Sequence, residues 1–173
     1  MKTLIKNGLL IDPANQVQAY LNLILEDGKV VAVTEEEPEA DRVIDATGKV
    51  VAPGFIDIHM HEDPVKDGKI EFCIFDAMLR MGVTTAVGGN CGINVYDPVK
   101  YLDMVEKDGA PVNVMLFAGH QYFREAAGAL DKYAPVTKEQ QEHMKKGLEK
   151  ALEAGCVGIS YGLRYVPGTG RDE

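Results

Sequence analysis

The strongest chemical signal in the sequence is a pair of histidines, His59 and His61, which stand one residue apart at the end of an apolar run. That run, residues 50–58, has the composition of a buried strand. Side chains at positions i and i+2 of a strand point to the same side, so both imidazoles could approach one metal ion together. The chain has only four histidines, which favours a metal site over two ordinary surface or core histidines. Asp57 or Asp63 could then fix an imidazole tautomer by accepting its hydrogen bond.

Cys91 is the best candidate for a further metal ligand. It follows a second apolar segment, residues 83–87, within the glycine-rich sequence GGNCG. One thiolate and two imidazoles are donors that suit zinc. The commonest fate of a free cysteine is a small buried hydrophobe, and we expect that fate for Cys73 and Cys156. A nucleophilic thiolate is the other alternative for Cys91, although no histidine is placed in the sequence to serve as its base.

Four residues further along the chain are candidate substrate contacts. His120 follows the apolar run of residues 112–118, where it is equally suited to a structural hydrogen bond. Tyr161 ends the last apolar run, and Arg164 and Tyr165 follow it in a predicted loop. Loops held by a rigid scaffold carry a large share of binding residues, so we expect these side chains to face a substrate.

The elements that position these residues fall into two parts. The first part, residues 1–50, predicts a small all-β module with strands at residues 3–11, 21–25 and 29–33. Asp27 and Gly28 form a two-residue hairpin signal, because both tolerate the positive φ that such turns require. A module of this size buries little apolar surface by itself.

From about residue 51 the pattern changes to alternating strands and helices. Four strands are expected, the first ending in His59 and the others at residues 84–87, 112–118 and 157–161. Helices are expected around residues 71–81, 98–108 and 137–154, and Thr137 with Gln140 forms a capping box for the last. This alternation implies an α/β fold with parallel strands and crossover helices.

Residues 51–173 predict the first four β/α units of a barrel. A complete (β/α)₈ barrel needs about 250 residues, whereas roughly 120 follow the β module. The candidate residues His59, His61, Cys91 and His120 all fall at the carboxyl ends of strands, where such folds carry their sites. Half a barrel exposes strand edges, so we expect an apparently truncated chain whose missing half, or another chain, is needed.

The charge balance limits the partners. With 18 basic and 27 acidic residues the formal charge is −9, which argues against nucleic acid, because binding phosphates needs clustered Lys and Arg. No apolar run of about 18 residues could span a membrane, and the start of the chain lacks a signal peptide. An odd count of three cysteines fits a reducing compartment, so we expect a cytoplasmic protein.

Several segments resemble a known family. Residues 51–61, VAPGFIDIHMH, resemble the opening strand of the amidohydrolase superfamily, whose members carry a small β-sandwich beside a metal-dependent barrel. Residues 82–85 and 89–92, GVTT and GNCG, resemble more narrowly the N-acyl-D-amino-acid deacylase (D-aminoacylase) branch. The segments GH at 119–120 and GISYGL at 158–163, with Tyr165 and Pro167 after them, also match that branch.

The resemblance implies one or two zinc ions. His59 and His61 would bind one metal, and Cys91 would bind or bridge a second position. Tyr165 resembles a substrate-contacting tyrosine of the branch. The remaining ligands and the aspartate that serves as general base are expected beyond Glu173, so the catalytic residue itself is unknown here and the isolated chain is expected to be incomplete.

The implied activity is hydrolysis of a linear amide in a small N-acyl amino acid by a zinc-activated water. Two alternatives stay open. One is a cyclic amidase of the dihydroorotase or hydantoinase kind, which a lysine at the end of the fourth strand would favour, although this sequence has Ile159, Ser160 and Tyr161 there. The other is a truncated module that binds metal without catalysis.

Overall fold

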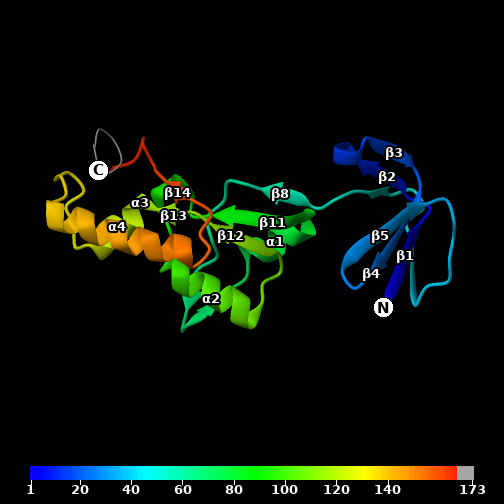
Figure 1. The fold of residues 1–173 in the computed structure, drawn as a ribbon, viewed down its shortest axis with the longest axis horizontal. Helices are drawn as coiled ribbons and strands as arrows, with labels where there is room; N and C mark the ends of the chain where they lie inside the picture. Colours follow the sequence, from blue (N-terminus) through cyan, green and yellow to red (C-terminus); the bar gives the residue numbers. More distant parts are fainter. Residues whose placement is uncertain (167–173) are drawn as a thin grey trace. The chain divides into compact units, whose positions relative to one another are not determined.

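The computed structural model describes residues 1–166, and the chain divides into two compact units, Met1–Pro53 and Gly54–Glu173 (Figure 1). Pro167, one of the residues that carry the family resemblance, lies outside the described residues. Over residues 1–166, no helix combines the length and the apolar character that a membrane span requires.

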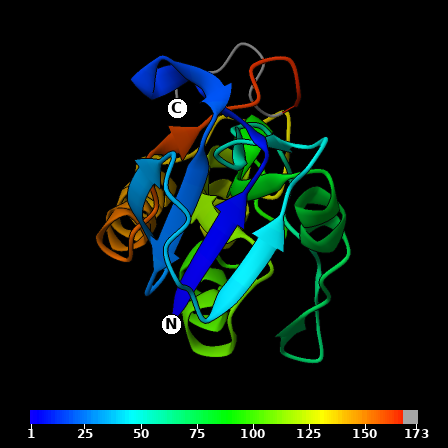
Figure 2. The same ribbon diagram turned by 90° about the vertical axis from the view of Figure 1, so that its right-hand side faces the viewer.

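The first unit contains two sheets. The four-stranded sheet has the order β5-β4-β1-β6, formed by β1 (Lys2–Lys6), β4 (Asn22–Glu26), β5 (Lys29–Thr34) and β6 (Arg42–Asp45). Strand β1 runs antiparallel to β4 and parallel to β6. The dark-blue and cyan arrows of Figure 2 show the parallel pair, β1 and β6. The three-stranded sheet has the order β3-β2-β7, formed by β2 (Leu9–Asp12), β3 (Val17–Tyr20) and β7 (Val50–Val51). A 3₁₀ turn, η1 (Pro13–Asn15), links β2 to β3.

Local turns explain how this unit differs from the expected strands. The predicted hairpin at Asp27 and Gly28 is confirmed, since both residues have positive φ, 49° and 76°. The predicted strand over residues 3–11 is instead two strands, because Asn7 adopts a left-handed conformation with φ 65°. The Asn7 side chain holds this break by donating a hydrogen bond to Asp45 Oδ1 at 3.1 Å.

The second unit has parallel strands. Strands β8 (Phe55–Asp57), β11 (Val83–Gly88) and β12 (Asn113–Leu116) form a sheet of order β12-β11-β8, and β13 (Ala118–Gly119) pairs with β14 (Ile159–Ser160). All of these pairings are parallel, as the alternation in the sequence predicts. A short hairpin, β9 (Val65–Lys66) with β10 (Lys69–Ile70), was not expected. The molecule is therefore of mixed α/β class.

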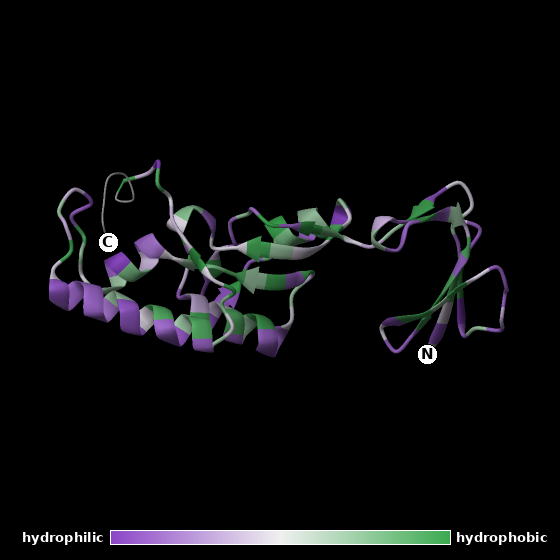
Figure 3. Cartoon of the chain, turned by 45° about the horizontal axis from the view of Figure 1, so that its top comes forward, coloured by the Kyte–Doolittle hydropathy of each residue, from purple (hydrophilic) through white to green (hydrophobic). Residues whose placement is uncertain are grey.

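Four helices accompany these strands in the described part of the chain: α1 (Ile74–Arg80), α2 (Pro98–Asp108), α3 (His120–Ala126) and α4 (Lys138–Glu153). The predicted bounds of α2 are confirmed, and α4 begins after Thr137 with the expected capping box. Helix α3 was not predicted, so His120 begins a helix as well as following a strand. Helix α4 begins with a run of polar residues and carries Met144, Leu148, Ala151 and Leu152 in its later turns. Figure 3 shows it mainly purple with green segments.

The core of the second unit lies between the strands and helices. Its buried members include Met60, Phe75, Met78, Ala86, Tyr101, Leu116, Phe123 and Ala151. Complete burial of a large side chain such as Phe75 or Leu116 contributes about 1.5–3 kcal/mol. Tyr101 also donates a hydrogen bond from its hydroxyl to the Asp63 carbonyl at 3.1 Å, which fixes α2 against the segment that follows the histidines.

Strand β8 differs from the buried strand that its composition predicts. Phe55 and Ile56 are each 64% exposed, and Ile58 is 70% exposed. The reason is topological, because β8 is the last strand of its sheet in the described residues and is paired on one side only, with β11. An apolar strand at an open sheet edge is a surface that proteins usually cover.

Candidate metal centre

The structure brings the side chains of His59 and Cys91 together. The Cys91 Sγ lies 3.4 Å from His59 Nε2, although the two residues are 32 positions apart in the chain. His59 is exposed and Cys91 is half-buried, so both donor atoms belong to an accessible surface. The loops that follow β8 and β11 therefore lie together at one end of the sheet, and they bring this pair of side chains into contact.

The histidines follow strand β8 but do not belong to it. The strand ends at Asp57, whose Oδ1 accepts a hydrogen bond from the His59 backbone N–H at 3.0 Å. An aspartate that bonds the backbone two residues on is a common way to end a strand in a turn. Side-chain alternation nevertheless persists, because Met60 is buried in the core while His59 and His61 are both exposed.

Cys91 lies in the 3₁₀ turn η2 (Asn90–Gly92), directly after β11. Its backbone is left-handed, with φ 59° and ψ 19°, and it stands between two glycines of positive φ, Gly89 and Gly92. The end of β14 packs against this turn, since a Cβ added to Gly162 would lie 2.2 Å from the Cys91 carbonyl oxygen. The loop that carries Tyr161 is thus adjacent to the cysteine.

The donor pair suits a zinc ion in chemistry and in spacing. Zinc bonds of about 2.3 Å to sulfur and 2.0–2.1 Å to nitrogen, at a tetrahedral angle, place the two donors roughly 3.5 Å apart. The 3.4 Å separation of Cys91 Sγ and His59 Nε2 is close to this value. Within residues 1–166, no group of three or more His, Cys, Asp or Glu side chains is gathered closely enough to hold a metal. His61 is therefore not part of a three-residue cluster with His59 and Cys91, and its ligand role stays a prediction.

Asp63 has a structural partner instead of an imidazole. Its carboxylate accepts backbone hydrogen bonds from Cys73, Ile74 and Phe75 at 2.7–3.0 Å, and so caps helix α1 from a distance. The Cys73 thiol also donates to Asp63 Oδ1 at 3.0 Å. The expectation that Cys73 is buried is wrong, since it is exposed, whereas Cys156 is buried as expected.

Glu62 is a buried carboxylate next to His61, and the sequence pattern predicts no particular role for it. It is 3% exposed, and its Oε1 accepts a hydrogen bond from Asn94 Nδ2 at 2.9 Å. Asn94 also donates a hydrogen bond to the Phe117 carbonyl at 3.0 Å and accepts one from the Gly119 N–H at 2.7 Å, so it links Glu62 to the backbone around β13. Gly88 leaves the space that Glu62 occupies, because a Cβ there would lie 2.7 Å from Glu62 Cγ.

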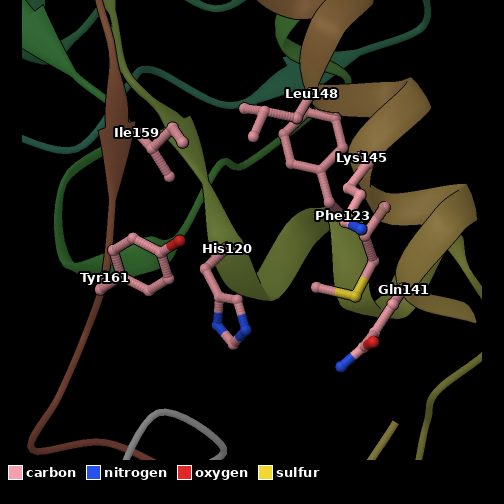
Figure 4. Close-up of a pocket in the computed structure, with 8 residues that line it drawn as sticks. His120, Phe123, Gln141, Lys145, Leu148, Ile159 and Tyr161 are labelled. Atoms are coloured by element: carbon pink, nitrogen blue, oxygen red, sulfur yellow. The ribbon is translucent and has the colours of Figure 1, made fainter. Parts of the chain in front are cut away.

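A cavity of about 270 Å³ adjoins the loop after β14 (Figure 4). Its lining residues are His120, Phe123, Gln141, Met144, Lys145, Leu148, Ile159 and Tyr161. His120 is buried, and its ring centroid lies 5.2 Å from that of Tyr161. Arg164 and Tyr165, the other predicted substrate contacts, are exposed and are not in this lining.

Comparison with known proteins identifies the family. A model described as the amidohydrolase family matches residues 42–164. Two enzymes of Alcaligenes xylosoxydans xylosoxydans, an N-acyl-D-glutamate deacylase and a D-aminoacylase, are 32% and 30% identical over 95% of this chain. A crystal structure of N-acyl-D-glutamate deacylase from Bordetella bronchiseptica, complexed with zinc and a phosphonate inhibitor, superposes with a TM-score of 0.82 at 32% identity. The superposition covers 96% of this chain and 39% of the Bordetella chain.

The chain therefore belongs to the amidohydrolase family, and its likeness is to the N-acyl-D-amino-acid deacylase branch. It spans 38% of the length of both Alcaligenes relatives.

Proposed function

We propose that the protein contributes to the metal-dependent hydrolysis of a linear amide in a small N-acyl-D-amino acid. The observation that carries this proposal is the 3.4 Å approach of Cys91 Sγ to His59 Nε2, at the loops where the family resemblance is most specific. The likeness to the zinc-bound deacylase of Bordetella bronchiseptica supports zinc as the metal.

A zinc ion held by these residues would supply Lewis-acid polarisation of the amide carbonyl and would lower the pKa of a water molecule. Cys91 and His59 would hold this ion, and His61 would complete or extend the ligand set. Arg164 is an exposed cation that can bind a substrate carboxylate through two parallel hydrogen bonds. Tyr165, on the same loop, would contact the substrate, and His120 would do so from the cavity that it shares with Tyr161.

The remaining ligands and the general base are proposed to lie outside residues 1–173. Two facts support this: fewer than three candidate ligands gather in the described residues, and the chain spans 38% of its relatives' length. We assign the second unit to the first half of a (β/α)₈ barrel and the first unit to a small β-sandwich. The open edge of β8, with Phe55 and Ile56 exposed, is then covered by later strands or by another chain.

Metal content tests the site. Purified protein dialysed against zinc is expected to retain the ion, and the Cys91→Ser and His59→Ala variants are expected to lose most of it, because each removes one of the two adjoining donors. Cys73→Ser is the matched control, since that thiol bonds Asp63 in another part of the unit. Equal zinc content in all four proteins, measured by elemental analysis, would contradict the assignment.

Substrate turnover tests the reaction. A full-length protein that carries this sequence is expected to release acid from N-acyl-D-amino acids, while the 173-residue chain alone is expected to be inactive. Opening of dihydroorotate or hydantoin without linear-amide hydrolysis would replace the proposal by a cyclic amidase. Zinc binding without turnover of either substrate by the full-length protein would leave a non-catalytic metal-binding module.

The proposal includes a reducing, cytoplasmic location. Its support is that Cys73, Cys91 and Cys156 are all free, since a disulfide would remove the proposed ligand. Recovery of the protein from a membrane or secreted fraction of its cells would oppose it.

A further inference from the structure

The turn that carries Cys91 has a backbone conformation that its surroundings must impose. Cys91 has φ 59°, a left-handed backbone value that residues with a Cβ rarely adopt. The neighbouring Gly89 has φ 72° and cannot carry a side chain, because a Cβ there would lie 2.1 Å from the Phe117 carbonyl oxygen. Unfavourable backbone conformations persist only where other contacts hold them, and they concentrate at functional sites.

Ser160, on strand β14, holds this turn from one side. Its hydroxyl oxygen accepts a hydrogen bond from the Gly92 N–H at 3.0 Å, and the same hydroxyl donates to the Gly89 carbonyl. Gly89 precedes the turn and Gly92 is its last residue, so one side chain links the two ends of the segment that presents Cys91. The serine is 71 positions from Gly89 in the chain, and this bridge therefore exists only in the folded protein.

Asn90 ties the same turn to the histidine segment. Its Nδ2 donates to the Val87 carbonyl at 2.7 Å and makes longer contacts of 3.3 and 3.4 Å with the carbonyls of Met60 and Ile58. Ile58 and Met60 are the residues on either side of His59. The side chain next to Cys91 thus contacts the backbone carbonyls of the residues immediately before and after His59.

From these contacts we infer that Asn90 and Ser160 are positioning residues, which set the separation of Cys91 Sγ and His59 Nε2 before any metal binds. The inference rests on the proposed metal site. Two donors held at the spacing that zinc requires lose little freedom when the ion arrives, whereas donors on two independent loops must first be ordered. Neither side chain needs to touch the metal for this role.

Cobalt binding by the 173-residue protein provides the test, because a thiolate–cobalt charge-transfer band reports the sulfur–metal bond directly. Asn90→Ala and Ser160→Ala are each expected to weaken cobalt binding by about tenfold or more, as loss of a partner that orients a ligand usually does. Their band at saturation is expected to be altered. Ser160→Thr keeps the hydroxyl and is expected to stay within about threefold of the unaltered protein.

Asn113→Ala is the matched control. Asn113 Nδ2 donates to the Thr84 carbonyl at 2.8 Å, the same kind of link between neighbouring strands, but far along the strands from Cys91. It is expected to leave cobalt affinity unchanged. Unaltered affinity and spectrum in folded Asn90→Ala and Ser160→Ala would overturn the inference. Circular dichroism establishes folding, and if Asn90→Ala fails to fold, the Ser160→Ala and Ser160→Thr pair decides alone.

The Cys91→Ser variant of the 173-residue protein distinguishes failure of the metal site from failure of the positioning role. If its cobalt binding is insensitive to Cys91→Ser, the proposed metal site fails and the inference fails with it. If binding depends on Cys91 but is the same in the Asn90→Ala and Ser160→Ala variants, the metal site stands and the positioning role is wrong.

Discussion

At the level of single residues, two of the acidic neighbours of the histidines, Asp57 and Asp63, have structural roles. Asp57 ends β8 by bonding the His59 N–H, and Asp63 is completely buried at the N-terminus of α1. Burial alone would raise the pKa of Asp63, but the hydrogen bond from the Cys73 thiol and three backbone N–H donors outweigh it and hold the pKa below its ordinary value of 3.8. The ionised carboxylate is thus the form that the fold stabilises.

Asp63→Asn is expected to lower the free energy of unfolding at pH 7 by about 1–3 kcal/mol, because it removes a charged acceptor from buried donors. A lowered carboxyl pKa adds stability above the unfolded value of 3.8, and that stability is lost as the pH falls through the folded value. The difference between the two proteins should therefore shrink at pH values below about 3.8.

Urea unfolding at pH 7 and at pH 3 measures the Asp63 effect. Asp76→Asn is the control, because Asp76 is an exposed carboxylate in the first turn of the same helix. A gap between Asp63→Asn and the unaltered protein that is as large at pH 3 as at pH 7 would show that the charge is not responsible.

At the scale of elements, helix α4 shows how a local signal specifies a boundary. The Thr137 hydroxyl accepts a hydrogen bond from the Gln140 N–H at 3.2 Å, and Gln140 Oε1 accepts one from the Thr137 N–H at 2.9 Å. Both partners lie within four residues, so the sequence alone predicts the start of the helix. The helix then buries Ala151 completely and contributes Leu148 to the cavity beside His120.

Thr137→Ala is expected to destabilise the protein by about 1 kcal/mol, since it removes the side-chain acceptor at the helix N-terminus. Thr137→Ser retains the hydroxyl and is expected to restore most of that stability. Thermal unfolding followed by circular dichroism compares the three proteins. Indistinguishable midpoints for Thr137→Ala and Thr137→Ser would mean that the cap contributes nothing in this helix.

At the scale of the whole molecule, the proposed barrel predicts a sheet edge that needs a partner. Strand β8 pairs only with β11 in the described residues and exposes Phe55 and Ile56, each at 64%. An apolar edge of this kind pairs readily with another chain unless it is covered or charged. The 173-residue chain is therefore expected to self-associate through this edge.

Ile56→Lys is expected to reduce that self-association, because a lysine on an edge strand opposes pairing with a second strand. Light scattering across a concentration series measures the effect. Leu152→Lys is the matched control, as Leu152 is an exposed apolar residue on helix α4 and offers no strand edge. Equal reduction by both substitutions would indicate general apolar association rather than pairing at β8.

Features that depend on near neighbours can be predicted from the sequence alone. The Asp27–Gly28 turn, the capping box of α4, the bounds of α2 and the parallel α/β alternation all follow from interactions within a few residues or from side-chain periodicity. The motifs around His59 and Cys91 were also sufficient to indicate the family, because residue type and spacing carry that resemblance.

The packing of the folded chain sets which of the candidate groups lie close together. It brings Cys91 next to His59 and places Asp63 at the N-terminus of α1. It also brings Ser160 to Gly89, 71 positions away, where it bonds the turn that carries Cys91. Contacts of this kind depend on how strands and helices pack. In the sequence, the carboxylates of Asp57, Glu62 and Asp63 are chemically equivalent acceptors near the histidines, so residue type does not distinguish between them. Residue type therefore predicted which chemistry was available, and packing selected the residues placed to perform it.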